Sequence, residues 1–243
     1  MRTFIPTLLK GLSVAALAAV IAMPVSTTET NAQAATAEKK VEKKKKRKRD
    51  PRSRIYRTKS CMACHGRNGA KAIRDYPNLA GQNAKYLTQQ MLDIQSGKRV
   101  ASVEEETGHP RTKGMADIMH LVNKDEIKDL AAWLSELPPA KLRPPEEPVS
   151  EEQIAAGKKA YKKLGCKACH SKDGTKASNK AYPIIAGQKK AYLINQMTDM
   201  REKVRVNGKS KLMYGVIKRA KDEQIVAIAD YLSTVERKAK KKK

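Results

Sequence analysis

The chain of 243 residues is poor in aromatic side chains, with one Phe, one Trp and eight Tyr. Aromatic residues dominate the energetics of protein cores, so a core made of side chains alone is disfavoured. Acidic residues are also few, since 25 Asp and Glu stand against 51 Lys and Arg, for a formal net charge of +26. Only four histidines and four cysteines are present. These shortages predict that something besides side chains fills the interior.

The sequence also lacks a hydrophobic run long enough to cross a membrane comfortably. Its longest apolar stretch, from Gly11 to Met23, has 13 residues, about 20 Å as a helix against about 30 Å of hydrocarbon. Arg2 and Lys10 precede this stretch, and Ala32-Gln33-Ala34 follows it as a small-x-small cleavage site. The order predicts a secretory signal peptide over residues 1–34, with an uncleaved anchor as the alternative. We therefore expect a mature protein in the periplasm, without a transmembrane span and without nucleic acid as a partner.

The four cysteines occur in two short motifs, Cys61-Met62-Ala63-Cys64-His65 and Cys166-Lys167-Ala168-Cys169-His170. Disulfide pairing is the ordinary use of cysteine in an exported chain. A redox C-x-x-C pair is a second alternative, but it needs a βαβ context that the surrounding sequence does not show. The C-x-x-C-H pattern, present twice, is instead typical of covalent c-type haem attachment. It predicts two haem c groups bound through Cys61, Cys64, Cys166 and Cys169, with His65 and His170 as iron ligands.

The chain contains an internal duplication. Tyr76-Pro77-Asn78-Leu79-Ala80-Gly81-Gln82 returns 106 residues later as Tyr182-Pro183-Ile184-Ile185-Ala186-Gly187-Gln188. The haem motifs are 105 residues apart, and the closing segments around Ile127 and Ile225 are 98 apart. The first copy is therefore about eight residues longer before its last helix. Because each copy carries its own haem motif, the duplication predicts two working sites.

These repeats and the charge distribution divide the chain. Residues 137–148 hold five of the eleven prolines, which predicts a semi-rigid linker. Residues 38–54 carry a net charge of +8 and residues 237–243 carry +6. The expected parts are a signal peptide (1–34), a disordered Lys/Arg-rich arm (35–54), a first domain (55–137), a Pro-rich linker (138–149), a second domain (150–236) and a basic tail (237–243).

Local patterns predict an all-α fold. Ser150 with Gln153 and Asn123 with Glu126 have the spacing of capping boxes at helix starts. Apolar residues recur at helical spacing after both caps, and a last helix is expected from about Asp222 to Val235. No segment alternates convincingly between apolar and polar residues.

The sixth iron ligand comes from a short set of residues. His109 and His120 are the only histidines outside the haem motifs, and both lie in the first copy, so two bis-histidine sites are excluded within one chain. Met115 lies twelve residues before Ile127, and Met213 lies twelve residues before Ile225. This shared register predicts Met115 and Met213 as axial ligands, on the loop that enters the last helix of each copy.

Other methionines fit the ligand role less well. Met119 competes with Met115, but we match it to Arg219, which cannot bind iron. Met91, Met197 and Met200 have the spacing of core residues on the middle helices.

Two C-x-x-C-H units, each followed by Y-P-x-x-A-G-Q and Y-L-x-x-Q-M and closed by a methionine and a helix, resemble cytochrome c4 over residues 55–236. This family consists of tandem two-haem class I cytochromes c. The resemblance implies two small helical domains, each with one low-spin haem ligated by His and Met. It also implies that the carbonyls of Pro77 and Pro183 orient the ligand imidazoles.

The resemblance further implies that the first helix of each domain crosses the last through a glycine and an aromatic residue. Gly157 and Tyr161 with Tyr231 fit this pattern. The first copy has Arg52 at the glycine position, so a wider crossing or a shorter helix is expected there.

An iron with six protein-saturated positions has no place for a substrate and changes only its redox state. We therefore expect a two-haem electron carrier, not an enzyme, between a respiratory donor complex and a terminal acceptor such as an oxidase. The alternatives are a two-haem peroxidase, an electron-transfer subunit of a dehydrogenase, and a purely electrostatic binding module. The basic arms predict an acidic redox partner or an anionic membrane surface, unless they serve only solubility.

Overall fold

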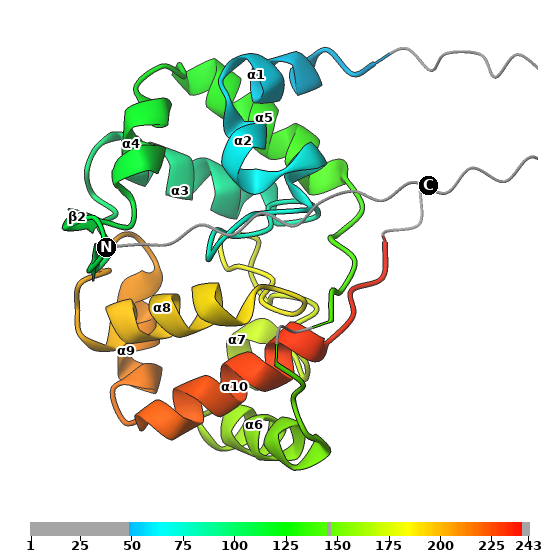
Figure 1. Ribbon diagram of the computed structural model, residues 1–243, viewed down its shortest axis with the longest axis vertical. Coiled ribbons are helices and arrows are strands. Elements are labelled where there is room, and N and C mark those ends of the chain that lie inside the picture. Colours follow the sequence, from blue (N-terminus) through cyan, green and yellow to red (C-terminus); the bar gives the residue numbers. More distant parts are fainter. Residues whose placement is uncertain (1–48, 145–146, 240–243) are drawn as a thin grey trace, which may run out of the picture. The chain divides into compact units, whose positions relative to one another are not determined.

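The computed structural model describes residues 49–144 and 147–239, which form two helical repeats (Figure 1). The expected signal peptide, most of the basic arm and the last four lysines lie outside the described residues. The helices of the first repeat are α1 (Arg52–Thr58), α2 (Cys61–His65), the 3-10 helix η1 (Arg67–Gly69), α3 (Ala84–Gln95), α4 (Lys113–Met119) and α5 (Lys124–Glu136). Those of the second are α6 (Glu151–Lys163), α7 (Lys167–His170), α8 (Lys190–Arg201), α9 (Ser210–Ile217) and α10 (Asp222–Thr234).

Both predicted capping boxes are present. The Asn123 side chain accepts from Glu126 N at 2.9 Å, and Asn123 N donates to Glu126 Oε2 at 2.9 Å. Ser150 Oγ accepts from Gln153 N at 3.3 Å, and Ser150 N donates to Gln153 Oε1 at 2.8 Å. Each box satisfies backbone donors that the first helical turn leaves unpaired, a contribution of about 1 kcal/mol.

In the second repeat, α6 and α10 cross at close range (Figure 1). A Cβ atom on Gly157 would lie 1.9 Å from the Ala227 carbonyl oxygen and 2.7 Å from Tyr231 Cβ. Tyr161 and Tyr231 pack edge to face beside this point, with ring centroids 5.8 Å apart. The glycine-and-aromatic crossing expected there is confirmed.

The first repeat replaces the glycine crossing by an ion pair. Arg52 Nη2 lies 2.6 Å from Glu136 Oε2 at the end of α5 and 2.7 Å from Asp50 Oδ2. Tyr56 and Trp133 keep the aromatic contact at 5.2 Å between ring centroids. Helix α1 has 7 residues where α6 has 13, so the shorter-helix alternative is the one found. Because α1 begins at Arg52, the helix starts within the segment assigned above to the disordered arm (35–54).

The additional residues of the first repeat form the described strands, β1 (Val103–Glu104) and β2 (His109–Pro110), an antiparallel pair. This hairpin, with two residues in each strand, is too small to change the all-α class. His109 is the exposed first residue of β2, paired with Glu104.

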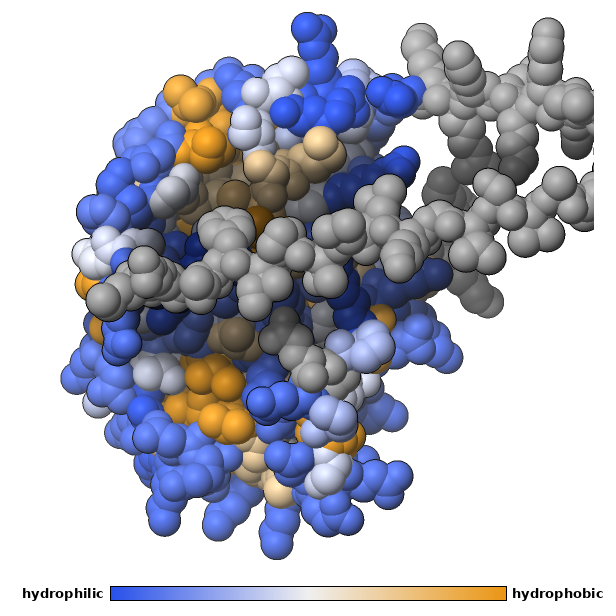
Figure 2. All heavy atoms as spheres, viewed as in Figure 1, coloured by the Kyte–Doolittle hydropathy of each residue, from blue (hydrophilic) through white to orange (hydrophobic). Residues whose placement is uncertain are grey.

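Each repeat has its own apolar core. The larger core side chains of the first include Tyr56, Met119, Ile127 and Leu134, and those of the second include Tyr161, Ile225, Ile228 and Leu232. On the face drawn in Figure 2, hydrophilic residues predominate, and apolar residues form separate patches. None of the described helices is long and apolar enough to cross a membrane.

The proline-rich connection follows α5 without helix or strand in its described part. Ala140 within it is buried, and a Cβ atom on Gly81 would lie 3.3 Å from Pro139 N. Arg237, assigned above to the basic tail, packs against the same turn, where its guanidinium donates to the Ala80 carbonyl at 3.4 Å and to the Gly81 carbonyl. The linker and the start of the tail therefore contact the first domain.

Candidate haem sites

Each C-x-x-C-H motif includes a short helix, and its two thiols lie about one turn apart, with Cys166 as the N-cap of α7 (Lys167–His170). Cys61 and Cys64 lie on α2, and the four cysteines, Cys166 and Cys169 included, are all free thiols. Residues three apart share a helix face, which is the arrangement that two vinyl groups of one porphyrin require. Burial raises the pKa of the Cys61 and Cys166 thiols to about 11, so both are protonated at neutral pH. The disulfide alternative is not realised.

The two histidines end these helices and are buried. His65 is 6% exposed with Nδ1 2.9 Å from the Pro77 carbonyl oxygen. His170 is 4% exposed with Nδ1 3.0 Å from the Pro183 carbonyl oxygen. A carbonyl only accepts, so Nδ1 carries the hydrogen in both rings and Nε2 keeps its lone pair. This contact matches the outer-shell hydrogen bond expected of Pro77 and Pro183.

Burial also lowers the pKa of both imidazoles, although the carbonyl contacts oppose the shift. The rings are therefore neutral, which is the form that binds iron. The residues fit haem c: each site supplies two free thiols and one neutral, oriented imidazole. The described residues contain no group of three or more His, Cys, Asp or Glu side chains that would hold a bare metal ion.

The sequence reasoning missed two tyrosine hydroxyls in these sites. Tyr56 donates to the Gly66 carbonyl at 2.8 Å, and Tyr161 donates to the Ser171 carbonyl at 2.8 Å. Gly66 and Ser171 directly follow the ligand histidines, so the first helix of each repeat anchors the end of its haem motif. The sequence does indicate this pair, because Tyr56 and Tyr161 are 105 residues apart, the same offset as the haem motifs.

The predicted methionine ligands lie on helices and not on loops, which corrects that expectation. Met115 is on α4 and Met213 is on α9, and both are half-buried against the core of their own repeat. Apolar residues of these short helices pack onto the cores, which stabilises helix where no regular element was expected.

The match of Met119 to Arg219 was wrong. Met119 ends α4 and Ile217 ends α9, and each side chain is 1% exposed. Ile217 cannot bind iron either, so Met115 with Met213 remains the pair that both repeats share. Met91, Met197 and Met200 are buried on α3 and α8, as expected of core residues, and His120 is exposed.

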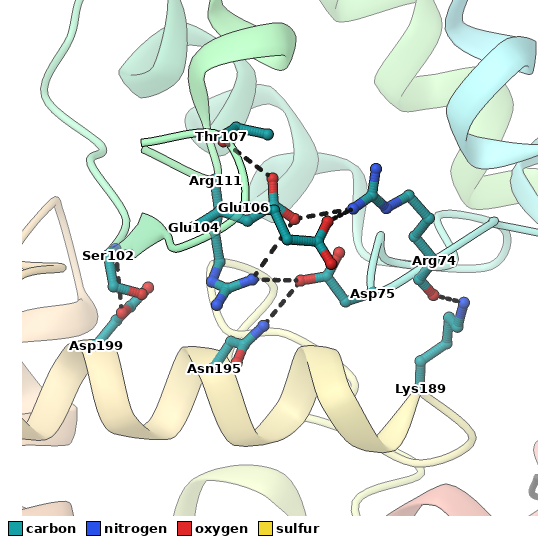
Figure 3. A network of polar contacts seen from close by, with 10 residues as sticks. All are labelled: Arg74, Asp75, Ser102, Glu104, Glu106, Thr107, Arg111, Lys189, Asn195 and Asp199. Carbon is teal, nitrogen blue, oxygen red and sulfur yellow. Dashed lines mark hydrogen bonds and ion pairs between the residues drawn. The ribbon is translucent and has the colours of Figure 1, made fainter. Parts of the chain in front are cut away.

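The extra hairpin of the first repeat is tied to the segment before Pro77 and to the second repeat (Figure 3). Arg74 pairs with Glu104 at 3.2 Å, and Arg111 pairs with Asp75 at 3.2 Å. Asn195 of α8 donates to the same Asp75 carboxylate at 2.9 Å. Asp75 therefore bridges Arg111, which directly follows the hairpin, and α8 of the second repeat.

Comparison with known proteins agrees with this architecture. The Cytochrome c family model matches residues 53–138 and 154–236. Fold and sites therefore define a c-type cytochrome with two domains, each of which carries one haem c.

Similar proteins identify the group of c-type cytochromes to which the chain belongs. Cytochrome c4 of Azotobacter vinelandii is 32% identical over 71% of this chain and 82% of its own length. The crystal structure of reduced recombinant cytochrome c4 from Pseudomonas stutzeri superposes with a TM-score of 0.63 at 26% identity, over 77% of this chain and 99% of that one. The thiosulfate dehydrogenase electron acceptor of Stutzerimonas stutzeri (strain A1501) is 27% identical over 74% of this chain and 80% of its own length. The chain belongs to the cytochrome c4 family of two-haem electron-transfer proteins.

Proposed function

We propose that this cytochrome is exported to the periplasm and carries electrons from a respiratory donor complex to a terminal acceptor such as an oxidase. The signal pattern of residues 1–34 supports export. The observation that carries the proposal is the repeated site: a neutral imidazole fixed by a proline carbonyl, with a methionine at the same register in each repeat.

In this proposal His65 with Met115, and His170 with Met213, are the axial ligands of the two irons. When bound, each haem iron supplies one-electron chemistry by changing between the ferric and ferrous states. The thioether favours the ferrous ion and raises the potential compared with a harder ligand. The proline carbonyls keep the imidazoles in one tautomer and orientation, so little reorganisation accompanies the change of redox state.

A visible and near-infrared spectrum of the oxidised and reduced protein tests this ligation. We expect two haem c per chain, both low-spin, with the weak ferric absorption band that methionine ligation produces. Rapid binding of cyanide or peroxide to one iron of the wild-type protein would contradict six-coordination and favour the peroxidase alternative.

A second candidate is suggested by the relatives named as electron acceptors of thiosulfate dehydrogenase. In this second candidate function, the electron donor is a thiosulfate-oxidising dehydrogenase, and the acceptor is again a terminal acceptor such as an oxidase. Stopped-flow reduction of the oxidised cytochrome by each donor at matched concentrations separates the two candidates. The physiological donor should reduce it much faster than the other, and comparable slow rates from both would contradict both assignments.

A further inference from the structure

The glutamine of the first A-G-Q segment reaches into the second domain. Gln82 Nε2 donates to the Ile184 carbonyl at 2.8 Å, and Ile184 N donates to Gln82 Oε1 at 2.8 Å. Gln82 is 4% exposed and Ile184 is 8% exposed. One side-chain amide thus pairs with both polar backbone groups of one residue, where water competes little and hydrogen bonds are strengthened.

The second A-G-Q segment makes the same contact in the opposite direction. Gln188 Nε2 donates to the Asn78 carbonyl at 2.9 Å, and Asn78 N donates to Gln188 Oε1 at 2.9 Å. Gln82 and Gln188 are 106 residues apart, and so are Asn78 and Ile184. The two contacts are therefore reciprocal, and each domain holds the other.

The residues held by the glutamines directly follow the prolines of the haem sites. The Pro183 carbonyl and the Ile184 N–H belong to one planar peptide group. That group accepts from His170 Nδ1 at one end and donates to Gln82 Oε1 at the other. In the first domain, the peptide group after Pro77 lies in the same way between His65 and Gln188.

Neighbouring contacts from the opposite domain hold the segments that lead into both prolines. Asn83 Nδ2 donates to the Tyr182 carbonyl at 2.8 Å, so Pro183 is held on both sides by the first domain. Lys189 Nζ donates to the Ala72 carbonyl at 3.3 Å. It also donates to the Arg74 carbonyl, upstream of Pro77 (Figure 3).

We propose that Gln82 and Gln188 are positioning residues that tune the haem of the opposite domain. Gln82 acts on the site of His170, and Gln188 acts on the site of His65. This inference rests on the iron ligation by His65 and His170 proposed above.

The physical basis is polarisation along a hydrogen-bonded chain. A glutamine oxygen that accepts from the peptide N–H increases the negative charge on the carbonyl of the same peptide. The carbonyl then accepts more strongly from Nδ1–H, which makes the imidazole a better donor to iron. A more basic ligand stabilises the ferric ion, so each glutamine lowers the potential of the haem across the interface.

The test is a redox titration of the holoprotein followed by NMR, in which the two haems titrate separately. Signals of each haem are assigned to its domain through the histidine of its own motif, His65 or His170. Gln82→Met keeps the side-chain length and removes both hydrogen bonds. It should raise the potential of the His170 haem, with a two- to fivefold change in its ferric-to-ferrous ratio, about 20 to 40 mV. Gln188→Met should do the same to the His65 haem.

Two further variants separate positioning from a merely structural role. Gln82→Glu keeps an acceptor for Ile184 N–H, so it should not raise the potential of the His170 haem. Asn207→Leu removes a different buried contact between the domains, 2.6 Å from Asn207 Nδ2 to Asp93 Oδ2. It should weaken the interface and leave both potentials within error.

The proposal requires that each glutamine variant shifts the potential of the haem in the other domain. Shifts in the haem of the mutated domain, equal shifts in both haems, or a matching shift in Asn207→Leu would overturn the inference. If Gln82→Met yields no holoprotein, Gln188→Met and Gln82→Glu still test the crossing, and a rise of the His170 potential in Gln82→Glu would contradict it. Failure of the ligation proposal would appear separately, as wild-type spectra without low-spin histidine-ligated haem.

Discussion

The imidazoles of His65 and His170 each depend on one backbone carbonyl and lie near the end of a motif helix anchored by a tyrosine hydroxyl. At the scale of the residue, the two sites therefore share the same arrangement of histidine, proline carbonyl and tyrosine hydroxyl. They differ at the residue after the histidine, which is Gly66 in the first domain and Ser171 in the second. Both adopt positive φ, at 67° and 64°. Glycine adopts this conformation without strain, whereas Ser171 depends on its surroundings to hold it.

The proposed axial methionines, Met115 and Met213, can be tested one domain at a time. Met115→Ala or Met213→Ala should remove the thioether, open one iron to cyanide and lower the potential of that haem only. Cyanide titration and redox titration measure both effects.

Met119→Leu is the matched control for Met115, because Met119 lies on the same helix and is 1% exposed. It should bind no cyanide, since leucine fills nearly the same volume in the core. Cyanide binding by Met119→Leu, and none by Met115→Ala, would transfer the ligand assignment to Met119.

At the scale of the element, the two repeats join their first and last helices differently. A side chain cannot fit at Gly157 without moving α6 away from α10. The first repeat instead uses a partly exposed ion pair between Arg52 and Glu136, and pairs of this kind contribute about 0 to 1 kcal/mol. The second domain thus depends on close helix contact to a degree that the first does not.

Gly157→Ala should destabilise the second domain by about 1 to 3 kcal/mol, the usual cost of overpacking a well-packed core. Gly215→Ala on α9 is the matched control, because a Cβ atom there meets nothing within 4 Å. In a helix this control should be neutral or stabilising by up to about 1 kcal/mol. Denaturant unfolding followed by haem absorbance measures both, and equal stability of the two variants would refute the close-crossing account.

At the scale of the whole molecule, charge is concentrated at the ends of the chain. Residues 38–54 and 237–243 together supply 14 of the 26 net positive charges. Segments with so few apolar residues cannot offset the entropy of ordering, which favours docking or solubility over a part in the fold. Arg52 and Arg237 are exceptions. Arg52 begins α1 and pairs with Glu136, and burial of Arg237 against Ala80 and Gly81 lowers the pKa of its guanidinium to about 10.

Deleting Glu38–Arg49 together with Lys238–Lys243, and keeping Arg237, should leave spectra and potentials unchanged. It should also flatten the salt dependence of the electron-transfer rate with an acidic partner, or of binding to anionic vesicles. Arms of this charge raise encounter rates by about 10- to 1,000-fold at low salt, and screening beyond about 8 Å at physiological ionic strength removes much of that gain.

Replacing the same lysines and arginines by serine at constant length separates charge from chain length. Stopped-flow rates and vesicle sedimentation over a range of salt concentrations provide the measurement. An unchanged salt dependence in both variants would assign the arms to solubility alone.

The sequence by itself determined the covalent chemistry, the duplication and the helical class of this protein. Haem attachment, the capping boxes at Asn123 and Ser150, and the glycine at position 157 depend on residue types at short spacing, which a sequence displays directly. The methionine register could also be read from the sequence, although the match of Met119 to Arg219 was wrong, because the 98-residue offset that relates Met115 to Met213 relates Met119 to Ile217.

Only the tertiary structure decided how the two copies are joined. The helical state of α4 and α9 depends on packing against distant residues, and the replacement of a glycine crossing by the Arg52–Glu136 pair joins residues 84 positions apart. Gln82 meets Ile184 across 102 positions and Gln188 meets Asn78 across 110. No local spacing specifies such partners, because only the packing of one domain against the other brings these distant residues within hydrogen-bond distance.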